Sequence, residues 1–111
     1  MIITDTRSTP LRVGTLGRAI GYAGIKPLKS YIGKRDLYGR KSRVTISNHV
    51  DALAVSAVLT MGEGNERIPL VIIREAPVQF SQNQKREELN IPAQKDLFSS
   101  IYKLKLKKPR T

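Results

Sequence analysis

The 111-residue sequence predicts an α+β fold in which a mixed sheet packs on one buried helix. Three observations lead to this expectation. A β-branched apolar run opens the chain at residues 1–4, an apolar helix pattern covers residues 51–61, and a second strand-type run follows at residues 68–73. A chain of this length has room for one core, because small domains bury a limited share of their surface. We therefore expect the helix to lie directly against the sheet.

The first expected element is a short buried strand from Met1 to Thr4 that runs into a polar stretch. Asp5 and Thr6 follow directly at its end. A strand end holds side chains rigidly while the adjoining loop keeps them accessible, so both residues are candidates for ligand contact. The other interpretation is a turn in which Asp5 makes local hydrogen bonds, as turn aspartates commonly do.

Glycines at positions 14, 17, 21 and 24 punctuate the next segment at spacings of three or four. Because an interior glycine costs a helix about 1 kcal/mol relative to alanine, we expect a strand around Arg18 to Tyr22 between tight loops. Residues 31–41 read as a charged loop, with glycines at turn positions. Its basic residues are able to contact phosphate, although a solvated loop is the simpler explanation. The alternation from Arg43 to Ser47 predicts a half-buried strand.

The strongest expected element is a helix from about Asp51 to Met61, with Asn48 or Ser47 as its N-cap and Gly62 as its stop. Its residues are apolar on nearly every side, which is typical of a buried helix. The only histidine, His49, is assigned to the start of this helix. With one histidine and no cysteine, the chain cannot assemble a histidine metal cluster, a thiolate site or a histidine-dependent triad of its own.

A glycine-rich acidic loop at residues 62–67 follows the helix and leads into the buried strand expected from Ile68 to Ile73. Glycines leave backbone N–H groups free to face a phosphate, while a carboxylate can hold the cation that neutralises it. A surface turn that simply ends the helix explains the same residues. The pattern alone leaves both interpretations open.

Beyond residue 76 the chain changes character, so we expect a domain over residues 1–76 and a basic extension over residues 77–111. A short helix is expected from Asp96 to Leu104, followed by a solvated lysine-rich end. The net charge of +11, from 20 basic and 9 acidic residues, makes polyanions the first partners to consider. The lack of cysteine, of a signal segment and of any apolar run near 20 residues favours a cytoplasmic protein without membrane contact.

The two candidate loops together resemble one family. In order and spacing, the carboxy-terminal half of F(420)-0:γ-glutamyl ligases is similar to three strings of this chain, IITDTRSTPLRVGTLGRAIGYAGIKPL, YIGKRDLYGR and VLTMGEGNERIPLVII. The resemblance covers about residues 1–74. It implies a ligase in which GTP activates a substrate carboxylate as an acyl phosphate that the amine of L-glutamate then attacks.

The resemblance also implies site residues and cofactors. It places Asp5 on one divalent cation and both Thr6 and Glu63 on a second, with Mn²⁺ or Mg²⁺ as the two ions and K⁺ as a further activator. The carboxylates of residues 5 and 63 would then converge beside the triphosphate. The nucleotide would be wrapped by the loop Met61, Gly62, Glu63, Gly64, Asn65, Glu66, Arg67 and Ile68. Oxygen ligands from these residues suit hard divalent cations.

Two departures from the family pattern affect the expected function. Arg7, Ser8 and Thr9 stand where the coenzyme ligases typically have a Phe-Gly-Arg run, and the TPLR and MGEG forms look more like a folate-type branch. The expected acceptor is therefore F(420)-0 or a folate-like molecule. The family's amino-terminal half has no counterpart here, so the chain is expected to work as a homodimer or with that missing half. The alternative is a small basic adaptor, structural or nucleic-acid-binding.

Overall fold

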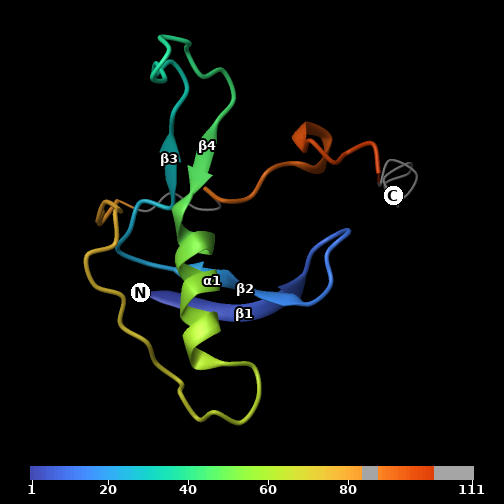
Figure 1. The fold of residues 1–111 in the computed structure, drawn as a ribbon, viewed down its shortest axis with the longest axis vertical. Coiled ribbons are helices and arrows are strands. Elements are labelled where there is room, and N and C mark those ends of the chain that lie inside the picture. The colour runs from blue at the N-terminus through green and yellow to red at the C-terminus, as the bar shows by residue number, and fades with distance from the viewer. Residues whose placement is uncertain (84–87, 102–111) are drawn as a thin grey trace.

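The computed structural model describes residues 1–83 and 88–101, whose path Figure 1 shows. Short strands together with one α-helix confirm the predicted α+β class. No helix in this described part of the chain is long and apolar enough to cross a membrane. In chain order the elements are β1 (Ile2–Ser8), β2 (Thr15–Tyr22), β3 (Leu28–Ser30), β4 (Ile46–Asn48), α1 (His49–Met61) and the 3-10 helix η1 (Ala93–Lys95).

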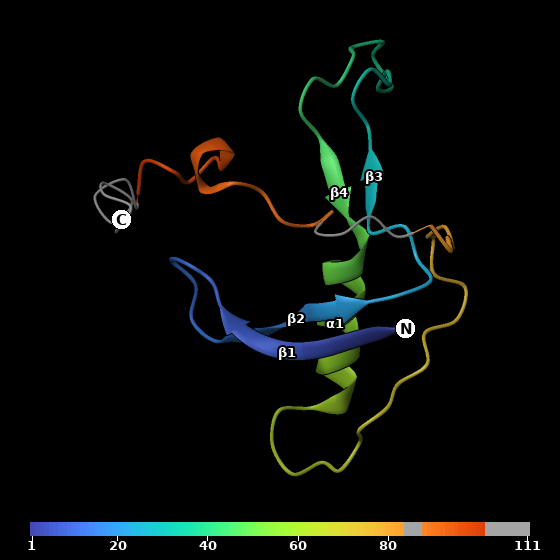
Figure 2. The same ribbon diagram turned by 180° about the vertical axis from the view of Figure 1, so that it is seen from behind.

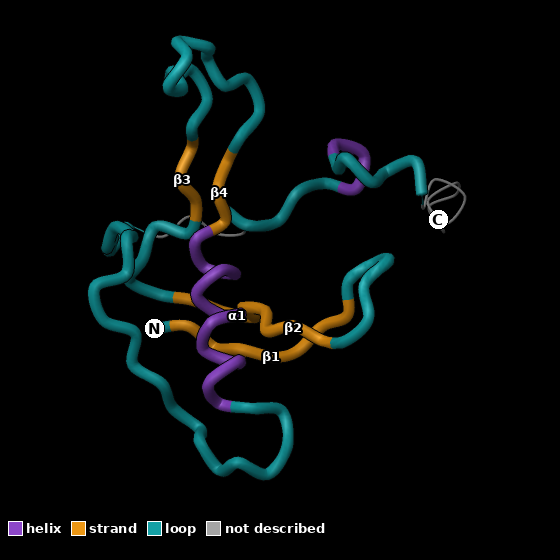
Figure 3. The backbone as a smooth tube through the Cα atoms, viewed as in Figure 1, coloured by secondary structure: helices purple, strands orange, loops and turns teal. Residues whose placement is uncertain are grey.

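The strands form two separate ribbons, each of two antiparallel strands (Figure 3). β1 pairs with β2 from Ile2 opposite Tyr22 to Ser8 opposite Thr15, and β3 pairs with β4. The predicted mixed sheet is therefore wrong for the described strands. Each ribbon joins two strands that follow one another in the sequence, and a direct connection of this kind makes neighbouring strands antiparallel.

β1 is longer and more exposed than the sequence predicts. The expected buried strand ended at Thr4, whereas β1 continues to Ser8 because β2 supplies ladder partners as far as Thr15. None of its residues is fully buried. Asp5 and Thr6 consequently lie inside a strand and not in the loop that follows it.

The bounds of α1 agree with the expected capping signals. Asn48 caps the helix, since its Oδ1 accepts a hydrogen bond of 3.0 Å from the backbone N–H of Asp51. Gly62 ends the helix with φ at +76°, and its N–H donates to the Val58 carbonyl oxygen at 2.8 Å. A positive φ strains most residues but not glycine. The helix begins two residues earlier than predicted, so that His49 is its first residue.

α1 lies across the β1–β2 ribbon and buries one face against it (Figures 1 and 2). Val50, Ala54 and Val58, spaced four residues apart, form that face, as the helical repeat requires. Leu59 is 84% exposed, so the prediction that the helix is buried on nearly every side is wrong. The reason is that, within the described residues, one small ribbon covers one side of the helix.

The strand expected from Ile68 to Ile73 does not form. These residues follow an irregular path, with Leu70 85% and Ile72 77% exposed. Apolar, β-branched residues favour strands because they pack well within a sheet, but a strand also needs a neighbour to pair with. The described part of the chain provides no such neighbour for this segment.

Two further expectations differ from the structure. The half-buried strand expected from Arg43 to Ser47 is displaced, since β4 begins at Ile46 and Val44 is 84% exposed at the hairpin. The helix expected from Asp96 to Leu104 is wrong over its described residues, which form turns after η1. The rest of that helix and the basic end fall on residues 102–111, outside the described residues. The boundary expected at residue 76 stays a prediction.

Candidate metal and nucleotide site

Asp5 and Thr6 lie side by side in the exposed middle of β1. In the ladder with β2, Asp5 is opposite Arg18 and Thr6 is opposite Gly17. The Asp5 carboxylate also accepts a hydrogen bond of 2.8 Å from the backbone N–H of Thr6. Both side chains are exposed, and both are therefore accessible to a ligand.

The two residues present their side chains to opposite faces of the ribbon. A Cβ atom added at Gly17 would lie 2.6 Å from the Ala54 carbonyl oxygen, so the side-chain direction at Gly17 points toward α1. Residues opposite each other in an antiparallel pair share a face, and neighbours along a strand alternate. Thr6 therefore faces the α1 side of the ribbon, and Asp5 faces the other side.

The loop after α1 is held by its own backbone and by one carboxylate. Gly62 at φ +76° and Arg67 at φ +59° turn the chain. The Glu66 carboxylate accepts a hydrogen bond of 2.9 Å from the Gly64 N–H and occupies the space beside Gly62 where a Cβ would otherwise lie. The carboxylate of Glu66 is thus used inside the loop, whereas that of Glu63 points elsewhere.

Glu63 connects this loop to the ribbon. The Thr15 hydroxyl donates a hydrogen bond to the Glu63 carboxylate, across 48 positions of sequence. Thr15 lies two residues from Gly17 in β2, so its side chain is on the α1 face as well. The repeat along a strand puts Thr15 about 7 Å from Gly17, whose ladder partner is Thr6. Glu63 and Thr6 therefore belong to one face of the ribbon.

Thr6 and Glu63 fit a shared divalent cation by donor type and by face, because both present oxygen atoms to the same side. Asp5 presents its carboxylate to the opposite side of the ribbon. Strand alternation therefore does not bring the carboxylates of residues 5 and 63 together, although the family resemblance implies that they converge. Among residues 1–83 and 88–101 there is no group of three or more His, Cys, Asp or Glu side chains that could hold a metal. The assigned ligands Asp5, Thr6 and Glu63 stay predictions.

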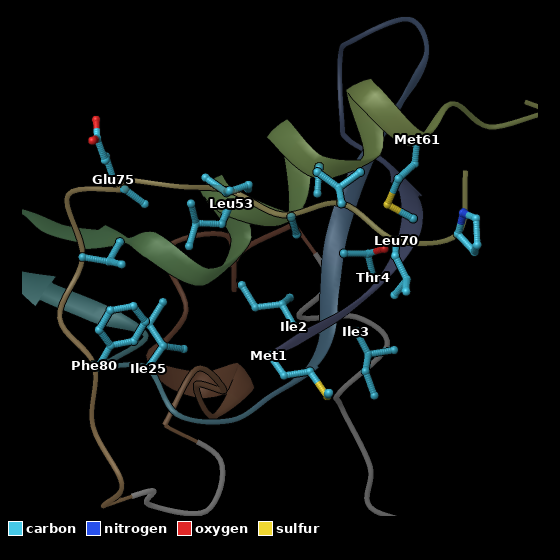
Figure 4. Close-up of a pocket in the computed structure, with 17 residues that line it drawn as sticks. Met1, Ile2, Ile3, Thr4, Ile25, Leu53, Met61, Leu70, Glu75 and Phe80 are labelled. Carbon is cyan, nitrogen blue, oxygen red and sulfur yellow. The ribbon is translucent and has the colours of Figure 1, made fainter. Parts of the chain in front are cut away.

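A second feature of this region is an apolar cleft of about 570 Å³ (Figure 4). Ile2 of β1, Leu53 and Met61 of α1 and Leu70 of the following segment surround it, and Glu75 lies at its border. The cleft is thus built from the two elements that carry the candidate site and from the segment that was expected to be a strand. An open apolar cleft of this size is typical of a surface that contacts another apolar group.

The family of the chain follows from its sequence. The family model described as F(420)-0:gamma-glutamyl ligase matches residues 1–75. The chain belongs to this ligase family. The match spans both candidate segments, from Asp5 and Thr6 in β1 to the loop that carries Glu63.

Curated relatives of the ligase family support the same assignment. A protein of Archaeoglobus fulgidus named coenzyme F(420):L-glutamate ligase is 47% identical over 74 residues, which are 67% of this chain and 30% of the relative. Proteins of the same name from Methanothermobacter thermautotrophicus and Methanocaldococcus jannaschii are 46% identical over 77 residues and 43% identical over 98 residues. These alignments cover 69% and 88% of this chain but 31% and 39% of the relatives. The chain thus spans about a third of the length of the curated relatives it matches.

One residue that contacts the candidate site, Thr15, escaped prediction. Thr15 is 48 positions from Glu63 and lies in a glycine-punctuated stretch without any local signal for a polar contact. Only the pairing of β2 with β1 and the crossing of α1 bring it to the loop. A pattern read along the chain cannot reveal a contact that depends on how two elements pack.

Proposed function

We propose that this chain is the carboxy-terminal portion of a GTP-dependent γ-glutamyl ligase that joins L-glutamate to F(420)-0 or a folate-like acceptor through an acyl phosphate. The family membership supports the reaction class. The observation that carries the site proposal is the hydrogen bond between Thr15 and Glu63. This bond holds the Glu63 carboxylate against the ribbon that contains Thr6. The acceptor and the nucleotide are part of the proposal.

In the proposed site, Thr6 and Glu63 hold one divalent cation on the α1 face of the ribbon, and the family resemblance assigns Asp5 to another, with Mn²⁺ or Mg²⁺ as the ions and K⁺ as an activator. Such ions neutralise the charge that develops on the triphosphate. The role of the chain is positioning. The loop from Met61 to Ile68 lies against the nucleotide, and its bond to Thr15 keeps the Glu63 carboxylate facing the ribbon.

Calorimetric titration tests this proposal most directly. We expect GTP to release or absorb heat on binding only when Mn²⁺ or Mg²⁺ is present, because the loop carries carboxylates that repel an uncompensated triphosphate. ATP serves as the comparison for nucleotide preference, and chelation of the metal should abolish the signal. Binding of GTP with unchanged affinity in excess chelator would contradict the metal-dependent site.

The proposed ligase also includes a partner that covers the apolar cleft. Five residues make up the buried hydrophobic core of the described part of the chain, while Leu70 and Ile72 remain largely exposed. We assign this surface to the amino-terminal portion of the ligase, since the relatives are about three times as long as the matched region. A strand from that portion would pair with residues 68–73 and complete the strand that the sequence favours.

A mixing experiment checks this assignment. The chain and the separately produced amino-terminal portion of the Archaeoglobus fulgidus relative are expected to form a 1:1 complex by light scattering. Replacing Leu70 and Ile72 with glutamate should abolish it, because charged side chains cannot be buried in the new interface without a large free-energy cost. Leu37→Glu is the matched control, since Leu37 is 99% exposed on the separate hairpin. A stable dimer of the chain alone, sensitive to the same double substitution, would instead assign the surface to a second copy.

A further inference from the structure

A basic cavity of about 400 Å³ lies where the β3–β4 hairpin meets the start of α1 and residues 77–79. The hairpin projects from this end of the helix (Figures 1 and 2). Three lysines and the only histidine border the cavity, and aspartate and glutamate are absent from the residues that line it in the described part of the chain. The lining residues are Lys26, Leu28, Lys29, Ser30, Lys34, His49, Pro77, Val78 and Gln79.

Backbone hydrogen bonds hold the walls of this cavity together. The Lys26 N–H donates to the Gln79 carbonyl oxygen at 2.9 Å, which ties residues 77–79 to the hairpin base. The His49 N–H donates to the Pro27 carbonyl oxygen at 2.8 Å, which ties the start of α1 to the same base. The positive end of the helix dipole at His49 adds to the charge of the lysines. The cavity is therefore formed before any ligand enters it.

Two of the three lysines share one aromatic ring. The Nζ atoms of Lys29 and Lys34 lie 5.0 Å and 5.7 Å from the centroid of the Tyr31 ring. Each ammonium group is attracted by the ring, which holds both lysines near the hairpin base.

The nearest carboxylates in the sequence are directed elsewhere. Asp36, near the hairpin tip, accepts hydrogen bonds from the backbone N–H groups of Tyr38 at 2.8 Å and Arg40 at 2.9 Å. Asp51, in the first turn of α1, accepts a bond of 3.0 Å from the Ala19 N–H of β2. Neither aspartate borders the cavity, so its positive charge is not balanced by an acidic residue of its own lining.

We propose that this cavity binds a phosphate group of a substrate, carried by the nucleotide or by a phosphorylated acceptor. The inference rests on the proposed ligase function, which supplies both kinds of substrate, but no residue of this cavity belongs to the predicted metal or nucleotide set. Lysine ammonium groups bind phosphate as point charges. The volume of about 400 Å³ lies in the range of small-molecule sites.

Titration of the whole chain with inorganic pyrophosphate, without metal, tests the cavity. Phosphorus NMR gives the affinity, and amide shifts of Lys29 and Lys34 locate the site. The double variant Lys29→Gln with Lys34→Gln is expected to bind at least about tenfold more weakly, because two charge-assisted contacts are lost. The matched control, Lys41→Gln with Arg43→Gln, removes the same charge from the same hairpin outside the cavity. It should change the affinity by less than about threefold, since salt screens distant charges.

Equal losses of pyrophosphate affinity in the two double variants would overturn the proposal, because they would mean that binding depends only on the overall charge of the chain. Absence of pyrophosphate binding by the unsubstituted chain would overturn it as well. Circular dichroism is the check that the variants remain folded, and Lys29→Arg with Lys34→Arg is expected to retain binding.

The two sources of phosphate are then separated with GTP and Mn²⁺. A lower GTP affinity in the Lys29 and Lys34 double variant assigns the cavity to the nucleotide, and an unchanged one assigns it to the acceptor. The outcomes also distinguish this inference from the ligase proposal. GTP–Mn²⁺ binding without pyrophosphate binding would contradict the phosphate cavity but not the ligase proposal. Pyrophosphate binding without GTP–Mn²⁺ binding would support the cavity and contradict the nucleotide site.

Discussion

Glu63→Gln is expected to weaken Mn²⁺-dependent GTP binding by about a hundredfold or more, on the scale of losses seen when groups that support a metal are removed. The substitution keeps the size of the side chain but removes its charge. The Glu63 carboxylate reaches the α1 face of the ribbon through the bond from Thr15. Calorimetry with GTP and Mn²⁺ measures the affinity, and electron paramagnetic resonance of free Mn²⁺ counts the bound ions.

Glu75→Gln is the matched control for this substitution. Glu75 is exposed and lines the same cleft as residues of α1, so the change removes the same charge near the same helix. Its effect on GTP affinity should stay within about threefold, because charges at the surface are screened by salt. Similar losses for Glu63→Gln and Glu75→Gln would show that Glu63 is not a metal ligand.

Asp5→Asn tests whether a cation binds at Asp5 in addition to the one proposed at Thr6 and Glu63. The family resemblance assigns Asp5 to the first cation, whereas strand alternation directs its carboxylate away from the face of Thr6. If Asp5 is a ligand, the variant should bind one Mn²⁺ fewer while Glu63 still supports the second. An unchanged number of bound ions would remove Asp5 from the site and leave the Thr6 and Glu63 face intact.

The helix was predictable because its signals are local. Asn48 three residues before Asp51 and Gly62 after Met61 are capping residues whose partners lie within one helical turn. Such short-range hydrogen bonds can be read along a sequence without knowledge of the fold. The glycine positions of the hairpin loop are of the same kind, since Gly33 and Gly39 both take the positive φ that the turn requires.

The strands were less predictable because pairing decides them. β1 includes the polar residues from Asp5 to Ser8 because β2 runs alongside, which no property of those residues reveals. Residues 68–73 have strand-type composition, yet remain unpaired in the described structure. The composition of a segment indicates how favourable its burial in a sheet would be, but it does not indicate whether a neighbouring strand is present.

The segments that carry the candidate site could be chosen from the sequence, but the spatial arrangement of their side chains could not. The residue types at Asp5, Thr6 and Glu63 and the family resemblance pointed to oxygen ligands. The positions of these side chains relative to one another depend on the close crossing of α1 over β2, which the glycine at position 17 permits. That crossing is a property of packing, and it is therefore the feature whose disturbance should have the largest effect on the fold.

Gly17→Ala is expected to lower the free energy of unfolding by about 2 kcal/mol or more, at the upper end of overpacking effects. The added Cβ would lie 2.6 Å from the Ala54 carbonyl oxygen, 2.6 Å from Val58 Cγ2 and 2.7 Å from Val58 Cβ. A backbone oxygen cannot rotate away, so α1 must move off the ribbon. For a small core, such a loss is a large part of the total stability. Urea unfolding followed by circular dichroism measures it.

Gly21→Ala is the matched control, because it makes the same change in the same strand. The nearest atom to its added Cβ is Ile3 Cδ1 at 3.9 Å, an ordinary contact. Its effect should be within about 0.5 kcal/mol, as for most substitutions outside a packed contact. Equal unfolding midpoints for the two variants would contradict the close crossing. Because movement of α1 would also carry the Glu63 loop away from Thr6, Gly17→Ala should weaken GTP–Mn²⁺ binding even where the chain remains folded, and Gly21→Ala should not.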